Sequence, residues 1–444
     1  MKKLFSCLIA WAFFVSTVCY AADQRGLTID IVGGTSAATP IAVIPMPYQG
    51  HSTPPGTDIS AVVEADLDRS GQFRSLPSAQ IVEHPTRGSD IQFATWRALK
   101  QNYILVGRVL DGEPNNYRIE YELFDVNKGE RLLGFAMTAR SDALRDVSHQ
   151  IADAIFEKIT GVRGAFWTHI AYIAVTAAPA GSPRKREFAL MVADSDGFNP
   201  QVVTRSMEPL MSPAWSPDGQ QLAYVSFERG NSAVYIQHLS TGKRELVSSF
   251  RGINSAPSFS PDGRKLALSL SRGGNPDIYT INLATKQLTQ LTRNFAIDTE
   301  PRWSPDGSTI YFTSDRSGRP QIYKMSAMDG GNTTRVTFQG VYNATPSVSY
   351  DGKKLLVEQG DGKVYRAAIM DMTTNPPTWN TLSVGPLDES PSFAPNASMV
   401  IYAARESGRG VLYAVSADAR VRERLVMANT DLREPAWGPY RTTR

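Results

Sequence analysis

The chain has 444 residues and carries 46 basic against 43 acidic side chains, which gives a formal net charge of +3. Such a balanced charge argues against nucleic acid as a partner, because proteins that bind it concentrate basic residues. With 42% hydrophobic residues, the chain is long enough to bury the cores of two domains. Its only cysteines, Cys7 and Cys19, lie near the N-terminus, so core burial rather than disulfide bonds must stabilise the remainder.

Residues 1–21 are typical of a secretory signal peptide. Lys2 and Lys3 precede an apolar run over residues 4–20, and Ala21 is the small residue after which we expect cleavage. We therefore expect an exported protein. Attachment of a lipid to one of the two cysteines is the alternative, although Val18 stands where a small residue usually precedes a lipidated cysteine.

Residues 22–164 form one predicted domain of mixed helix and strand. Strands are predicted over 40–46, 103–110, 117–126 and 131–138, and helices over 58–72, 90–101 and 141–160. Ahead of them, we expect residues 22–39 to be a flexible leading segment in which only 27–32 have the composition of a strand. This strand is either a frayed end, an edge strand, or a tether that adds itself to the sheet of a partner.

Residues 165–444 repeat one short phrase at nearly constant spacing. It reads Pro-Ala-Trp-Ser-Pro-Asp-Gly from Pro213, and related copies follow at intervals of 44 or 45 residues, beginning at Pro257, Pro301, Pro346, Pro391 and Pro435. This period is typical of the four-stranded blades of a β-propeller. The Ser-Pro-Asp-Gly part suits a tight turn, because proline restricts φ and glycine accepts a left-handed backbone.

The two ends of the repeat region complete each other. The phrase at Pro435 has no strands after it, whereas the strands predicted over 170–176, 187–193 and 201–204 have no phrase before them. Pairing both ends in one sheet gives six blades and closes the ring. The sequence therefore predicts an α/β N-terminal domain followed by an all-β six-bladed β-propeller, which the C-terminal strand closes.

Together, the signal peptide, the mixed domain and the six phrases resemble the TolB family of the Tol-Pal envelope system, over essentially the whole chain. The resemblance implies a non-catalytic periplasmic protein that links the lipoprotein Pal at the outer membrane to TolA of the inner membrane. It also implies roles in outer-membrane integrity and in envelope constriction during cell division. Other outer-membrane proteins are possible further partners, and the resemblance implies no cofactor and no small-molecule substrate.

The resemblance also suggests binding residues. The Pal site would include Ala256, Thr299 and Glu300, which we expect in loops around one mouth of the propeller channel. We expect a rim of arginines farther out on the same face, formed by Arg229, Arg272, Arg316, Arg319, Arg405 and Arg409. Members of the family commonly have a histidine at the position of Ile253. The TolA-binding segment would be the start of the mature chain, namely Ala22, Asp23, Gln24, Arg25, Gly26, Leu27, Thr28, Ile29, Asp30, Ile31, Val32 and Gly33.

A hydrolase-related protein is one alternative, since similar propellers occur in serine peptidases and sialidases. The sequence, however, contains no Gly-x-Ser-x-Gly motif and leaves no room for a hydrolase domain. Its five histidines are scattered without ligand spacing, so we predict no metal site, and we interpret the aspartates of the phrases as turn residues.

A carbohydrate-binding propeller is the second alternative, because fold does not determine function and aromatic residues are plentiful. Trp215, Trp303 and Trp437 nevertheless occupy the same position of the repeat. This shared position favours packing between blades over ligand binding.

Overall fold

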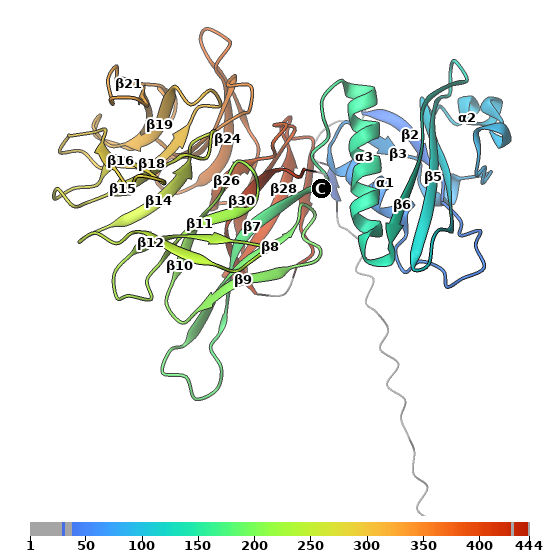
Figure 1. Ribbon diagram of the computed structural model, residues 1–444. Helices are drawn as coiled ribbons and strands as arrows, with labels where there is room; N and C mark the ends of the chain where they lie inside the picture. Colours follow the sequence, from blue (N-terminus) through green and yellow to red (C-terminus); the bar gives the residue numbers. More distant parts are fainter. Residues whose placement is uncertain (1–28, 32–37, 428–429, 443–444) are drawn as a thin grey trace, which may run out of the picture.

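The computed structural model describes residues 29–31, 38–427 and 430–442. The predicted signal peptide and residues 22–28, 32 and 33 of the proposed TolA-binding segment lie outside the described residues. Figure 1 shows two domains side by side, with helix α3 (Leu144–Thr160) at the boundary between the N-terminal domain and the propeller. Among the described helices, none has both the length and the apolar composition needed to cross a lipid bilayer.

The N-terminal domain is built on one five-stranded sheet in the order β3-β2-β4-β5-β6. Its strands are β2 (Thr39–Val43), β3 (Phe73–Ser75), β4 (Tyr103–Asp111), β5 (Asn116–Asp125) and β6 (Glu130–Arg140). β2 pairs in parallel with β3 and β4, whereas β4, β5 and β6 are antiparallel. The turn between β5 and β6 forms because Asp125 accepts hydrogen bonds from two following backbone N–H groups and Gly129 has a φ of +71°.

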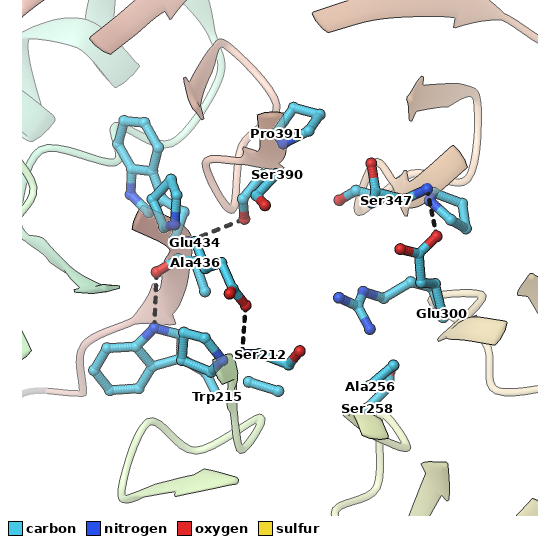
Figure 2. A pocket seen from close by; sticks show the side chains of 18 of the residues that line it. Ser212, Trp215, Ala256, Ser258, Glu300, Ser347, Ser390, Pro391, Glu434 and Ala436 are labelled. Atoms are coloured by element: carbon cyan, nitrogen blue, oxygen red, sulfur yellow. Dashed lines mark hydrogen bonds between the residues drawn. The ribbon is translucent and has the colours of Figure 1, made fainter. Parts of the chain in front are cut away.

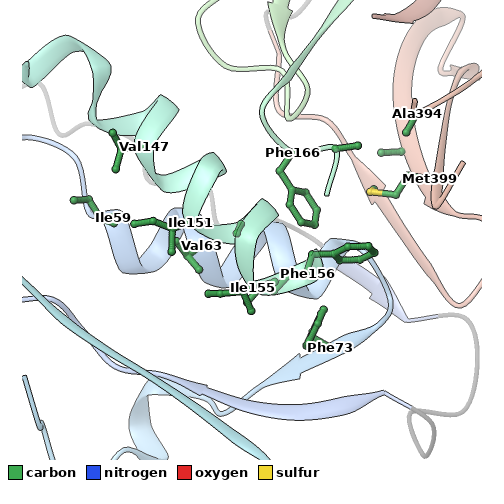
Figure 3. Close-up of a cluster of buried hydrophobic side chains, with 14 of the residues drawn as sticks. Ile59, Val63, Phe73, Val147, Ile151, Ile155, Phe156, Phe166, Ala394 and Met399 are labelled. Atoms are coloured by element: carbon green, nitrogen blue, oxygen red, sulfur yellow. The ribbon is translucent and has the colours of Figure 1, made fainter. Parts of the chain in front are cut away.

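Two helices cover one face of this sheet. α1 (Ile59–Arg69) begins after Asp58, whose carboxylate accepts a hydrogen bond from the backbone N–H of Ala61 at 3.1 Å. α3 ends at Gly161, which has the left-handed backbone common at helix ends. Apolar residues of both helices, including Val63 and Ile155, pack together in the core (Figure 3).

A shorter helix, α2 (Phe93–Ala98), covers the opposite face, where Trp96 is fully buried. The helix predicted over 90–101 was too long at both ends. Residues 88–90 form a 3-10 turn followed by the extended residue Ile91, and Lys100 has a left-handed backbone with a φ of +56°. Neither conformation continues an α-helix.

The remaining strands form the six predicted blades. Blade 1 contains β30 (Asp431–Tyr440), β7 (Thr168–Ala177), β8 (Arg186–Asp194) and β9 (Gln201–Ser206). Blade 2 contains β10 (Leu210–Trp215), β11 (Gln221–Ser226), β12 (Ala233–His238) and β13 (Arg244–Ser248). Blade 3 contains β14 (Asn254–Phe259), β15 (Lys265–Leu270), β16 (Asp277–Asn282) and β17 (Leu288–Gln290).

Blade 4 contains β18 (Asp298–Trp303), β19 (Thr309–Ser314), β20 (Gln321–Ser326) and β21 (Thr334–Arg335). Blade 5 contains β22 (Tyr342–Val348), β23 (Lys354–Gly360), β24 (Tyr365–Asp371) and β25 (Thr378–Thr381). Blade 6 contains β26 (Asp388–Phe393), β27 (Met399–Glu406), β28 (Arg409–Ser416) and β29 (Val421–Arg424). In each blade the first-named strand is innermost.

The C-terminal strand closes the ring as predicted. β30 pairs antiparallel with β7, so that Trp437 lies opposite Ile170 although the two are far apart in sequence. The indole Nε1 of Trp437 donates a hydrogen bond to Oγ1 of Thr168 at 2.8 Å. The indoles of Trp215 and Trp303 likewise donate to backbone carbonyls of neighbouring inner strands, at 3.0 and 3.1 Å, which confirms their role between blades.

The Ser-Pro-Asp-Gly phrases form the turns after the innermost strands. In the first copy, Oγ of Ser216 donates to Oδ1 of Asp218 at 2.6 Å and accepts from the backbone N–H of Gln221 at 2.9 Å, while Gly219 has a φ of +69°. The same serine-to-aspartate bond recurs at Asp262, Asp306 and Asp351. These aspartates therefore stabilise turns.

The two domains share one apolar core. Phe156 of α3 packs edge-on against Phe166 with ring centroids 5.6 Å apart, and this pair continues to Ala394 and Met399 of blade 6 (Figure 3). The backbone carbonyl of Arg163 accepts a hydrogen bond from the side-chain amide of Asn396 at 2.9 Å. Helix α3 is therefore held directly against the propeller.

The leading segment adds a fifth strand to blade 6. β1 (Ile29–Ile31) pairs antiparallel with β29, with Ile29 opposite Glu423 and Ile31 opposite Val421. Of the possibilities left open by the sequence, these three residues adopt the edge strand.

Candidate functional site

One backbone feature recurs at the centre of all six blades. The residue before each repeated proline has a left-handed backbone, with φ between +48° and +55°, at Ser212, Ala256, Glu300, Thr345, Ser390 and Glu434. At the same point a β-bulge interrupts the pairing of the innermost strand with the next. These residues surround a cavity of about 280 Å³ in the propeller channel (Figure 2).

This geometry corrects the expectation for Glu300, which lies within strand β18 rather than in a loop. Its Oε2 accepts hydrogen bonds from Oγ1 of Thr313 at 2.7 Å and from the backbone N–H of Thr345 at 2.8 Å. Glu434 accepts in the same way from the backbone N–H of Ser212 at 2.6 Å. Both glutamates therefore connect one blade to the next (Figure 2).

The other two proposed Pal residues lie in the same inner strands. Ala256 belongs to β14 and is only 6% exposed, so its contribution to a partner surface is small. Thr299 is half-buried in β18, directly before Glu300. The structure thus brings the three residues to one end of two adjoining inner strands.

Further carboxylates lie near this channel, whose lining also includes Arg302. Glu358 is 8% exposed, and burial together with the charges of Glu300 and Glu389 raises its pKa to about 7. Burial also raises the pKa of Glu434. Carboxyl groups that are costly to ionise favour a partner that brings positive charge or hydrogen-bond donors to the channel mouth.

Exposed apolar side chains surround the mouth. They lie on or beside the six linkers that join the outermost strand of one blade to the innermost strand of the next, and we call them the apolar ring. Its members are Met207, Met211, Ile253, Phe295, Ile297, Phe338, Val341, Val384 and Val426. Phe295 is 95% exposed and Phe338 is 74% exposed, which is unusual for phenylalanine and marks a candidate binding surface.

Basic residues lie on neighbouring hairpins of the same face. The backbone N–H of Ile253 donates to Ser271 Oγ at 2.7 Å, which places the β15–β16 hairpin beside a linker. Such hairpins carry the exposed residues Arg229, Arg272, Arg319 and Arg405, as expected for the rim. Arg316 is an exception, since it binds both carboxylate oxygens of the buried Asp298, at 2.9 and 2.7 Å.

The apolar ring was missed by the sequence analysis, apart from the remark on Ile253. Its members stand at variable distances before the repeated prolines, so the phrase alone does not point to them. The available signal was weaker: each otherwise polar linker contains or adjoins at least one large apolar residue. Only the ring geometry shows that these residues gather on one face.

A second group of charged residues lies buried between the domains. Asp66, His149 and Asp196 place possible ligand atoms within 4.8 Å of one another, although the sequence showed no ligand spacing. However, Arg69 binds Asp66 at 2.9 Å and Arg145 forms an ion pair with Asp196. Two guanidinium groups already balance these carboxylates, so the cluster fits an ion-pair network better than a metal site.

The fold and the candidate site define a two-domain β-propeller protein with an apolar and charged face around one channel mouth. Residues 27–132 match the family model of the TolB amino-terminal domain, and residues 156–441 match that of the TolB beta propeller domain. The chain is 73% identical over 442 residues to the Tol-Pal system protein TolB of Xanthomonas campestris pv. campestris and 74% identical to that of Xanthomonas oryzae pv. oryzae, covering 100% of each chain.

Among solved structures, TolB from Acinetobacter baumannii is similar, with a TM-score of 0.83 and 39% identity over 94% of this chain and 100% of that one. The chain therefore belongs to the TolB family of the Tol-Pal system.

Proposed function

We propose that this protein is a non-catalytic binding component of the Tol-Pal system in the periplasm, where it links Pal to TolA. In this role it contributes to outer-membrane integrity and to envelope constriction during division. The observation that carries the proposal is the apolar ring, which surrounds the acidic mouth on the face that holds Ala256, Thr299 and Glu300.

The Pal-binding face combines the properties of a protein interface. Exposed aromatic and aliphatic residues supply apolar area that a partner would cover, and desolvated aromatic anchors dominate many interfaces. Acidic residues at the centre and arginines farther out would orient a partner of mixed charge. Because Glu300 and Glu434 already bridge blades, we assign the larger part of the affinity to the apolar ring.

The test compares three serine variants. Phe295→Ser and Phe338→Ser remove exposed rings from the proposed face, and Met328→Ser removes a residue that is 82% exposed in the turn between β20 and β21, at the other end of the blade. We expect each phenylalanine variant to weaken Pal binding by about tenfold or more and Met328→Ser to leave it unchanged. Equal Pal affinity for all three variants in calorimetry would place the site elsewhere.

TolA binding is assigned to residues 22–33. Residues 29–31 pair with β29 at the edge of blade 6, and this intramolecular pairing supports the proposal that the segment adds to the sheet of a partner. Deletion of residues 22–33 should abolish TolA binding while the free energy of unfolding and Pal binding stay close to those of the full mature chain. Retained TolA affinity after the deletion would refute the assignment.

A further inference from the structure

A second, larger cavity of about 810 Å³ lies on the propeller where Gln150 of helix α3 adjoins it, and its volume is within the size range of small-molecule sites. Helix α3, blades 1 and 2 and the chain after β30 all contribute to its wall. The wall includes the turns at Asp218 and Ser240, which follow β10 and β12. These turns lie at the opposite ends of the strands from the linkers of the apolar ring, so the cavity lies away from that ring, although Trp215 lines both this cavity and the channel cavity.

Aromatic rings fixed in place form part of this wall. Trp215 and His169 are nearly parallel, with centroids 6.4 Å apart, and Trp215 also packs against the backbone of Gly438. A Cβ at Gly438 would lie 2.9 Å from the backbone carbonyl oxygen of His169 and 3.1 Å from the indole of Trp215, so only glycine allows this approach without a shift. The ring of Trp167 is held by the guanidinium of Arg441, 4.5 Å from its centroid.

The wall offers uncharged polar side chains and one carboxylate, that of Asp218, which pairs with no basic side chain among the described residues. The side chains of Gln150, Gln201 and Ser240 have no hydrogen-bond partner within the described parts of the chain, and all three line the cavity. Arg441 is neutralised by Asp146, which it binds through two hydrogen bonds of 2.7 and 2.9 Å. Burial and the nearby Arg441 lower the pKa of His169 to about 4, so its imidazole is uncharged at neutral pH.

We propose that this cavity binds a short, uncharged oligosaccharide. The C–H faces of pyranose rings pack against aromatic side chains, and sugar hydroxyls pair with amide and hydroxyl groups such as those of Gln150, Gln201 and Ser240. An anionic peptide or nucleotide would find no free basic group among the described wall residues, because Arg441 is paired with Asp146, and it would also face the carboxylate of Asp218. The sugar is a ligand held between α3 and the propeller, and this site is independent of the proposed Pal and TolA sites.

The experiment uses the full mature chain and three probes: a β-1,4-linked trimer of N-acetylglucosamine, maltotriose and a trimer of galacturonic acid. Binding is followed by calorimetry and by the fluorescence of the tryptophans. We expect at least one of the two uncharged trimers to bind with a Kd of about 1 mM or tighter and the acidic trimer to bind at least about tenfold more weakly.

Two matched arginine variants locate the site. Val202 of β9 lines the cavity and is 43% exposed, whereas Leu246 of β13 is 39% exposed, belongs to the equivalent strand of blade 2 and does not line the cavity. Val202→Arg should weaken sugar binding by about tenfold or more, and Leu246→Arg should not, with similar urea unfolding of both. The proposal would be overturned if neither uncharged trimer bound at about 10 mM or if the acidic trimer bound more tightly than both. It would also be overturned if the two arginine variants bound the sugar with equal affinity.

Discussion

Nδ1 of His149 lies 2.6 Å from Oδ2 of Asp66, and both side chains are almost completely buried between α1, α3 and the propeller. Arg69 extends this contact across the domain boundary, because its Nη2 binds Asp66 and also donates to Oγ of Ser195 at 2.9 Å. The Nε2 of His149 faces Asp196 of the propeller at 3.6 Å. The two domains are therefore joined by a buried network of charges as well as by the apolar core.

The first prediction concerns this network. His149→Ala should lower the free energy of unfolding by about 3 kcal/mol, because Asp66 and Asp196 would remain buried with one compensating group fewer. His84→Ala, at an exposed position, is the control and should change it little. Urea unfolding of both variants checks this, and equal midpoints would show that the network adds no stability.

The second prediction is a pH dependence. Glu423 of β29 is 2% exposed, and its Oε2 has no hydrogen-bond partner among the residues that the structure describes. Burial raises its pKa to about 7 from an ordinary value of 4.5, against the opposing effect of Arg69. The folded state therefore holds this proton more tightly than the unfolded state. Its contribution to stability is fully present below about pH 4.5 and is lost as the pH rises through about 7.

Glu423→Gln should consequently increase the free energy of unfolding at about pH 8 by about 1 to 3 kcal/mol relative to the parent. It should also flatten the profile of this free energy against pH between about pH 5 and pH 8. The profile should not become flat, because the pKa values of Asp153 and Asp194 are also raised, to about 6, chiefly by burial. Glu130→Gln, on the exposed edge strand β6, is the control. A parallel shift of the Glu423→Gln curve at all pH values would contradict this account.

The third prediction tests ring closure. Removing residues 433–444 takes away most of β30, including Trp437, and leaves the edge of β7 unpaired. This truncated chain should aggregate or fail to fold, because an open sheet edge would replace the closed ring. A chain that lacks only residues 443 and 444 should melt as the parent does. A truncated chain that stays monomeric with the parental melting temperature would disprove the structural role of the last strand.

The sequence predicted the architecture well because a propeller blade is a local unit. The spacing of the repeated phrase and its turn residues were enough to predict the blades. The unmatched ends of the repeat region were enough to predict the pairing of β30 with β7. The candidate sites depend on contacts between distant residues, such as His149 and Asp66, which are 83 positions apart. The strand position of Glu300 also could not be predicted, because it depends on a left-handed bulge that a non-glycine residue adopts only when its surroundings enforce it.

The last prediction separates the charge of Glu300 from its structural role. Glu300→Arg would remove the acceptor for Thr313 and for the backbone of Thr345, so it should lower the free energy of unfolding by about 2 kcal/mol and disturb the mouth itself. Glu300→Gln keeps an acceptor oxygen and nearly the same shape while it removes the charge.

Pal binding should therefore be measured on Glu300→Gln, with Glu389→Gln as a control for an exposed carboxylate of the same mouth. If the Glu300 carboxylate attracts a positively charged group of Pal, affinity should fall by about 1 kcal/mol in Glu300→Gln, more than in Glu389→Gln, with parental urea unfolding. Because the charge of Glu300 helps to raise the pKa of Glu358, the same variant should also make Glu358 ionise at lower pH, which carboxyl NMR titration would detect. Unchanged Pal affinity together with this pKa change would show that Glu300 joins the blades and does not contact the partner.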